Sequence, residues 1–167
     1  MIEVRVQDLA AYHGEALARP VTAGLNPPTA RLQLLDQAAG PELTAQLQLQ
    51  EPLMVGSAIV SAPGALRVGL LVSAVVQEDG GEVTLKGVKR ATRSSLHRAD
   101  AWEIEHLALA PFGLGPGNLD VEDCADAMLE EISLFMETGR RPRTVTILAE
   151  TDEEAEAFVA RILRPAP

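Results

Sequence analysis

A glycine-rich segment, residues 110–118, holds the residues of this 167-residue chain that are best suited to contact a ligand. Glycine lets the backbone turn tightly and come close to a bound group, and the N–H groups at the start of a following helix attract phosphate oxygens. The residues that we predict to contact a ligand here are Gly113, Leu114, Gly115, Pro116, Gly117 and Asn118. Because Pro116 has no N–H, the contact rests on the other amides. A compact strand-to-helix turn that needs glycine is the alternative interpretation.

Acidic residues follow this segment directly. Asp120, Glu122 and Asp123 fall in the first turn of the next predicted helix, where they complement the helix dipole. They also compete with a phosphate for the same positive potential. We therefore expect only weak anion binding at this place.

The residue types that usually carry catalysis or metals are scarce and scattered. His13, His97, His106 and Cys124 match no zinc spacing, and the sequence contains neither a G-x-S-x-G motif nor a Walker loop. Cys124 falls on the apolar side of its predicted helix, which favours a buried, inert thiol over a nucleophile. The sequence therefore predicts no catalytic residues, no metal and no cofactor.

Apolar patterning places these residues on alternating strands and helices. Strands are predicted at 2–6, 16–22, 57–61, 68–76, 104–110 and 144–149, and helices at 29–39, 42–49, 85–99, 120–136 and 151–162. This order predicts an α/β fold, a three-layer α/β/α sandwich with a mixed, mainly parallel central sheet of about six strands. Pro20 weakens its strand unless it lies at an edge or a break. We predict a single domain at 1–163 and a short tail at 164–167.

Composition and charge exclude several classes of partner. Fourteen Lys and Arg against 24 Asp and Glu give a net charge of −10, which opposes binding to double-stranded nucleic acid. No apolar run approaches 18 residues, so no membrane span is expected. One cysteine and a polar start predict a cytoplasmic protein.

One predicted helix carries a basic face in this acidic chain. Lys86, Lys89, Arg90, Arg93 and His97 recur every three to four residues. Such a face is either simply solvated or docks on an acidic surface such as a second copy of the chain, which would make a homo-oligomer.

An ordered set of segments along the chain resembles the macro domain family, whose members bind ADP-ribose. The segments that carry the resemblance are Asp8-Leu9, Ala38–Leu43, Val55–Val60, Val68–Val76, Ala110–Gly117 and Val145–Phe158. The resemblance implies a macro-domain fold and an ADP-ribose-like small ligand. It also implies that Asp8 recognises adenine and that the glycine-rich segment is the family's second phosphate loop.

Other family motifs are missing. The N-A-A-N motif is replaced by residues 19–22 and the triple-glycine first phosphate loop by residues 28–30, which contain neither asparagine nor glycine. The histidine of a central strand is replaced by an apolar residue near Val72, and the aromatic after the second loop by Asn118 or Leu119. In hydrolytic members the asparagine and the first loop orient the distal ribose and the attacking water. Their loss argues against that catalysis.

Three functions remain open at this stage. The first is a divergent macro-type module that binds ADP-ribose or a related nucleotide or phosphate ligand weakly and without catalysis. The second is a degenerate scaffold that acts through self-association or a protein partner. The third is an enzyme, either an atypical ADP-ribosyl hydrolase or a remote relative of the N-terminal domain of leucyl aminopeptidases.

Overall fold

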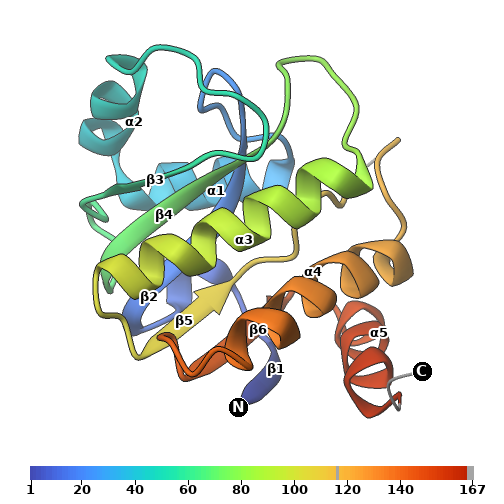
Figure 1. The fold of residues 1–167 in the computed structure, drawn as a ribbon. Helices are drawn as coiled ribbons and strands as arrows, with labels where there is room; N and C mark the ends of the chain where they lie inside the picture. Colours follow the sequence, from blue (N-terminus) through green and yellow to red (C-terminus); the bar gives the residue numbers. More distant parts are fainter. Residues whose placement is uncertain (116, 165–167) are drawn as a thin grey trace.

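A six-stranded sheet forms the centre of the computed structural model, which describes residues 1–115 and 117–164. The strands are β1 (Ile2–Val6), β2 (Gly14–Thr22), β3 (Ala58–Ser61), β4 (Val68–Gln77), β5 (His106–Leu109) and β6 (Thr144–Ala149). Their order across the sheet is β1-β6-β5-β2-β4-β3. Neighbouring strands pair parallel, except β3, which runs antiparallel to β4 at one edge (Figure 1). The predicted mixed, mainly parallel sheet is confirmed.

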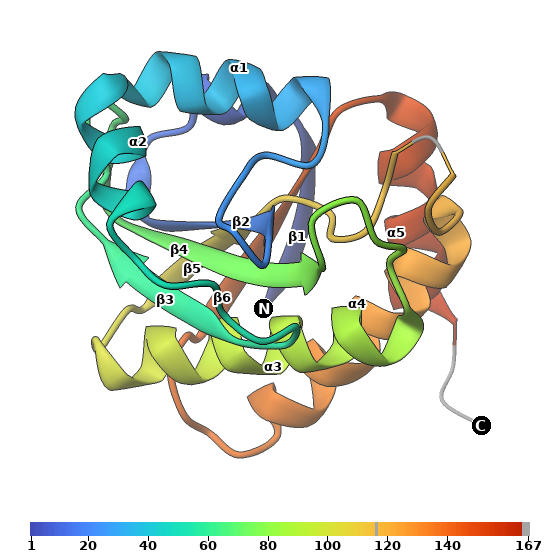
Figure 2. The ribbon, with the colours of Figure 1, turned by 90° about the horizontal axis from the view of Figure 1, so that it is seen from above.

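Helices cover both faces of this sheet. They are the short 3₁₀ helix η1 (Leu9–Ala11) and the α-helices α1 (Ala30–Ala39), α2 (Pro41–Gln48), α3 (Leu85–Ala101), α4 (Val121–Met136) and α5 (Asp152–Leu163). Helices α1 and α2 lie on one side, and α3, α4 and α5 on the other (Figure 2). The three layers agree with the predicted α/β/α sandwich.

Alternation along the strands builds two cores. In β4, Val72 and Val76 face the layer of α3 and α4, whereas Leu71 and Val75 face α1 and α2. Both cores are largely aliphatic, as the composition predicts. Leu85 at the start of α3 is 46% exposed and Leu70 near the start of β4 is only half-buried, so both lie at the margin of the core.

Side-chain caps fix where the helices around the loops begin. Thr29 Oγ1 accepts from Leu32 N at the start of α1, and Asp120 Oδ1 accepts from Asp123 N at the start of α4. Each cap satisfies an amide that has no partner within its helix. Thr29 and Asp120 were predicted as these two helix starts.

Pro20 lies in β2, a central strand, at the level where β5 has ended. The carbonyl of Ala18 accepts from Ala110 N on the β5 side, and alternation turns the ring nitrogen of Pro20 to the same side. The last residue of β5 that pairs with β2 is Leu109, so no ladder bond is lost at Pro20. The proline therefore marks a local break in the sheet, beyond which β2 and β5 separate.

The predicted basic face of α3 is partly neutralised within the molecule. Lys89 Nζ lies 2.7 Å from Glu130 Oε2, and Arg93 Nη2 lies 2.8 Å from Glu131 Oε1, so both side chains tie α3 to α4. Docking on an acidic partner stays a prediction. Among the helices at 1–115 and 117–164, none combines the length and the apolar character needed to cross a membrane.

Candidate functional site

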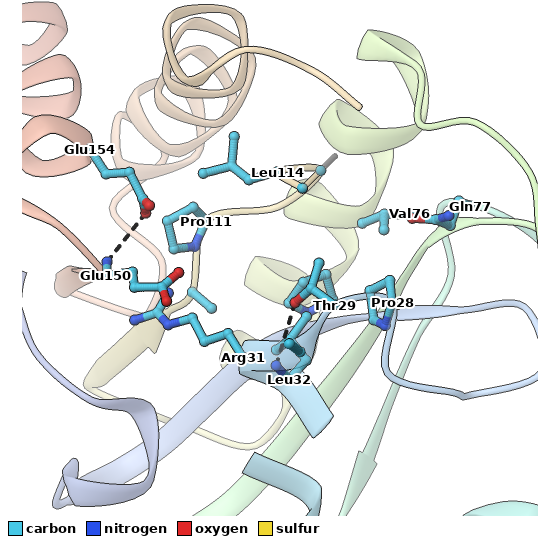
Figure 3. Close-up of a pocket in the computed structure, with 15 residues that line it drawn as sticks. Pro28, Thr29, Arg31, Leu32, Val76, Gln77, Pro111, Leu114, Glu150 and Glu154 are labelled. Carbon is cyan, nitrogen blue, oxygen red and sulfur yellow. Dashed lines mark hydrogen bonds between the residues drawn. The ribbon is translucent and has the colours of Figure 1, made fainter. Parts of the chain in front are cut away.

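A cavity of about 320 Å³ lies where β2 and β5 separate, at the carboxyl ends of the parallel strands. Open α/β sheets bind ligands at this edge. The cavity is lined by Pro20, Pro28, Thr29, Ala30, Arg31, Leu32, Val76, Gln77, Ala110, Pro111, Gly113, Leu114, Gly115, Glu150 and Glu154 (Figure 3). It therefore lies between the start of α1, the loop after β5 and the start of α5.

The loop after β5 lines this cavity with residues whose backbone amides are unpartnered among the described residues. The amides of Gly113, Leu114 and Gly115 have no acceptor among the described residues. The amides of Asn118 and Leu119 instead donate to the carbonyls of Gly115 and Gly113, both at 3.1 Å. The loop thus closes on itself, and three consecutive N–H groups remain for a ligand. Such a run of free amides suits an anionic oxygen.

The base of the loop is anchored in the core. Phe112 is fully buried, its amide donates to Met128 Sδ at 3.2 Å, and its carbonyl accepts from Cys124 Sγ at 2.8 Å. Burial raises the pKa of the Cys124 thiol far above its usual value. Cys124 is therefore a buried, protonated thiol, in agreement with the sequence analysis.

Two glycines of the loop differ in their surroundings. Gly115 has φ +134°, and a Cβ there would lie 3.0 Å from Thr29 Cγ2 on the other side of the cavity. Gly117 has φ +79°, and a Cβ there would meet no described atom within 4 Å. A side chain at position 115 would consequently bridge the cavity, whereas one at position 117 would not.

Helix α1 faces this loop with its N-terminus. The amides of Ala30 and Arg31 have no acceptor in the described part of the chain, because the Thr29 cap serves Leu32 and the Thr29 carbonyl serves Gln33. The positive end of the helix dipole adds to these donors. The cavity therefore has amide donors on two sides.

Arg31 is the basic side chain that lines the cavity, and its guanidinium is already engaged. Nη2 donates to the carbonyl of Gln7 at 3.1 Å and to that of Leu148 at 3.0 Å. Burial lowers the pKa of Arg31 below its usual value, and the nearby carboxylates of Glu150, Glu154 and Asp8 oppose this shift. Arg31 thus connects α1 to the ends of β1 and β6.

Acidic side chains border the same end of the cavity. Glu150 and Glu154 both line it, and Glu154 Oε1 accepts from the amide of Glu150 at 3.2 Å (Figure 3). These carboxylates repel an anionic ligand, so they offset part of the attraction from the amides.

Among the residues in place of the family's asparagine motif, Pro20 lines the cavity, and its side chain is apolar. Arg19 is fully buried, where Nε donates to Ser73 Oγ at 3.0 Å and Nη1 pairs with Asp36 of α1. Pro20 lines the cavity with its ring, and Val21 is buried in the α1 core. Of residues 19–22, Pro20 alone lines the cavity, so this stretch contributes no polar side chain to its lining.

A carboxylate fixes the loop after β2. Asp79 accepts from Thr22 Oγ1 at 2.5 Å, from Gly24 N at 2.8 Å and from Asn26 Nδ2 at 3.0 Å. The hydrogen bonds from Thr22 and Asn26 lower the pKa of Asp79. The clamp holds the segment that leads to Pro28, one wall of the cavity.

The structure separates the predicted ligand-contacting residues. Gly113, Leu114 and Gly115 line the cavity, whereas Gly117 and Asn118 do not, and Pro116 lies outside the described residues. Asp8 is exposed and caps η1, and it lines a neighbouring hollow. That hollow shares Ala30, Arg31 and Glu150 with the cavity, so the two are adjacent.

Sequence reasoning missed four polar residues of the cavity: Arg31, Gln77, Glu150 and Glu154. Glu154 falls within Val145–Phe158, one of the segments that carry the family resemblance. Gln77 and Arg31 stand in no motif. No cluster of three or more His, Cys, Asp or Glu side chains able to hold a metal is found at 1–115 and 117–164.

The family to which this chain belongs is shown by a match to a family model over more than half of its length. Residues 33–128 match the Macro domain family, and the chain belongs to it. A protein of Aeropyrum pernix is 24% identical over 154 residues, which cover 92% of this chain and 80% of the relative. Uncharacterised mycobacterial proteins are 26% identical over 128 residues, and the one from Mycobacterium bovis is covered to 36% of its length. The chain thus spans only part of those relatives.

Solved macrodomains share the fold. The Oceanobacillus iheyensis macrodomain with ADP has a TM-score of 0.86 at 15% identity, with 96% of this chain and 89% of that chain covered. The Trypanosoma brucei macrodomain in complex with ADP-ribose has a TM-score of 0.85 at 13% identity, with 96% and 68% covered. At these identities the likeness is one of architecture.

Proposed function

We propose that this protein binds ADP-ribose or a related nucleoside diphosphate weakly and does not hydrolyse it. The observation that carries the proposal is that Gly113, Leu114 and Gly115, whose amides have no acceptor among the described residues, line the cavity together with the start of α1. A diphosphate placed between them would accept from both sides. The related macrodomains solved with ADP and with ADP-ribose support this choice of ligand.

The expected direction of the ligand follows from the adjacent hollow that Asp8 lines. A nucleoside that extends from the cavity past Arg31 reaches Asp8, whose carboxylate can accept from the exocyclic amine of adenine. Asp8 therefore keeps its proposed role although it does not line the cavity itself. Its exposure to solvent makes this contact a modest contribution.

Weak binding follows from the charges. Glu150 and Glu154 line the cavity, and the guanidinium of Arg31 is engaged with two backbone carbonyls. Backbone amides must therefore hold the diphosphate without a free basic side chain among the lining residues. A dissociation constant in the micromolar range or above is expected, about −8 kcal/mol or weaker.

The absence of hydrolysis follows from the groups around the inner end of the cavity. Pro20 and Pro28 line it, and neither has an N–H or a polar side chain. Catalysis of hydrolysis needs a positioned water and a group that activates it. In the part of the chain that the structure describes, residues 19–22 supply neither.

Calorimetric titration of the full chain with ADP-ribose tests the binding. The wild type should release heat with a micromolar dissociation constant, and Gly115→Val should abolish it, because the new side chain meets Thr29 across the cavity. Gly117→Ala is the matched control, since it also replaces a glycine of positive φ but points into open space, so it should retain binding.

Three results would each overturn a part of the proposal. If the wild type releases no heat with millimolar ADP-ribose, the protein is a degenerate scaffold rather than a binding module. If Gly115→Val binds ADP-ribose as tightly as the wild type, the ligand binds elsewhere. Release of ADP-ribose from a mono-ADP-ribosylated protein substrate would contradict the absence of hydrolysis.

A further inference from the structure

Helix α3 carries a basic line on its solvent side, away from the cavity. Lys86, Arg90, Arg93 and His97 recur every three to four residues and are exposed. Arg93 pairs with Glu131 of α4. Lys86 and Arg90 line a shallow groove and form no ion pair with any described residue. The basic line therefore keeps two cations that its own chain does not neutralise among those residues.

Helix α4 carries an acidic line that matches it. Asp123, Glu130 and Glu137 follow one another at intervals of seven residues, so they lie along one side of the helix, and all three are exposed. Glu130 pairs with Lys89 of α3. In the described part of the chain, the carboxylates of Asp123 and Glu137 form no ion pair. The acidic line is thus also only partly neutralised.

The two lines lie side by side on one face of the molecule. Helices α3 and α4 belong to the same layer, and both are turned to the viewer in Figure 1. Lys89 Nζ lies 2.7 Å from Glu130 Oε2, and the rings of His97 and Phe135 are 5.0 Å apart. Because both contacts advance along the two helices together, α3 and α4 run in the same direction. We call this surface the α3/α4 face, with one basic and one acidic half.

Such a face is complementary to itself. A half-turn about an axis perpendicular to the face exchanges its two halves. In two copies related by this axis, α3 of each copy lies antiparallel on α4 of the other, and a basic line meets an acidic line twice. The arrangement is closed, so it ends at two copies.

We propose that this protein forms a symmetric dimer through the α3/α4 face, in which the basic line of each copy docks on the acidic line of the other. This inference does not depend on a ligand in the cavity. It assigns a role to the cations of α3 in a chain whose net charge is −10.

The size of the face sets the expected strength. Helix α3 has 17 residues and is about 25 Å long, and packed helices lie about 10 Å apart, so the two helices present about 500 Å² per copy. Stable interfaces cover about 800 Å² per partner, and charged contacts add more specificity than affinity. We therefore expect a transient dimer with a dissociation constant weaker than about 10 µM.

Sedimentation equilibrium of the full chain, at concentrations up to the millimolar range, tests the dimer. The wild type should show a reversible monomer–dimer equilibrium at about 0.1 M salt, where the repulsion between the two net charges is screened beyond about 10 Å. Lys86→Glu combined with Arg90→Glu places acid against acid and should weaken association at least about tenfold. Asp123→Lys combined with Glu137→Lys places base against base and should do the same.

A mixture of the two reversed variants provides the sharper test. In the mixed dimer each reversed line meets a line of opposite charge, so association should return to within about threefold of the wild type. A variant that fails to fold could not recover in this way. Arg5→Glu combined with Arg67→Glu is the matched control, because it changes the net charge by the same amount at exposed residues outside both helices and should leave the dimer intact.

Three outcomes would overturn the inference. A wild type that stays monomeric at millimolar concentration means that the basic line is solvated or serves another partner. A dimer that survives both charge reversals has its interface elsewhere. Association that strengthens between about 0.1 M and 1 M salt is held by apolar contacts rather than by charges. None of these outcomes affects the proposed binding of ADP-ribose, which is measured separately by calorimetry.

Discussion

The two loops that border the cavity follow parallel strands, yet they differ in composition and in how they are held. The loop after β5 is rich in glycine, leaves three amides free and is anchored by the buried ring of Phe112. The loop after β2 contains Pro27 and Pro28 and is held by hydrogen bonds to the exposed Asp79 carboxylate. The wall formed by the loop after β5 therefore consists of glycine-rich backbone, whereas the loop after β2 places Pro28 before the unpartnered amides at the start of α1. The contrast teaches that two loops at the same edge of a sheet can be fixed by different means, one by a buried aromatic ring and the other by a carboxylate.

The anchor of the loop after β5 should have the largest effect on stability. Phe112→Ala removes a fully buried ring and leaves a cavity in the α4 core, so the free energy of unfolding should fall by about 3–5 kcal/mol. Urea denaturation followed by circular dichroism measures this. Leu134→Ala on the exposed side of α4 is the control, with an expected change below about 0.5 kcal/mol. A similar loss in both variants would mean that the loop has no special anchor.

The clamp on the loop after β2 should matter less and depend on pH. Asp79→Ala removes three hydrogen bonds, but the carboxylate is exposed, so we expect a loss of about 1 kcal/mol at neutral pH. Because folding lowers the pKa of Asp79, its contribution is present above the unfolded value of about 4 and is lost as the pH falls through the lower folded value.

The difference in unfolding free energy between the wild type and Asp79→Ala should therefore shrink as the pH falls below about 4. Glu78→Ala changes the neighbouring exposed carboxylate and is the matched control. A difference that stays constant down to pH 2 would show that the clamp does not depend on the charge of Asp79.

The smallest effect concerns the charge that opposes the free amides. Glu154→Gln removes one negative charge from the cavity and keeps an oxygen that can accept from the amide of Glu150. ADP-ribose should bind about two- to fivefold more tightly, and the gain should shrink at high salt. Glu153→Gln, one residue earlier and outside the lining of the cavity, should change little. Weaker binding by Glu154→Gln would mean that this carboxylate contacts the ligand as an acceptor.

The fold was largely predictable, because its signals are local. Thr29 and Asp120 stand directly before amphipathic patterns and do cap α1 and α4. The alternation of strands and helices predicted the three layers. Pro20 was the ambiguous residue, and its place became clear only once the end of β5 beside it was known.

The candidate site was less predictable, because it depends on contacts between distant segments. The sequence pointed to the loop after β5 but could not show that the amides of Asn118 and Leu119 turn back to Gly115 and Gly113. Gln77 lines the cavity because β4 ends beside the turn after β2, and no motif marks it. Asp8 was predicted in the site and lies next to it, with Arg31 between the two hollows.

Arg31 has a consequence for the kinetics of binding. Its guanidinium joins the first turn of α1 to Gln7, which follows β1, and to Leu148 of β6, so this wall of the cavity is attached to two strands of the sheet. The start of α1, held in this way, cannot readily move to close over a ligand. Association should then proceed in a single step without a slow conformational phase, and the lifetime of the complex should be set by how fast its own contacts break.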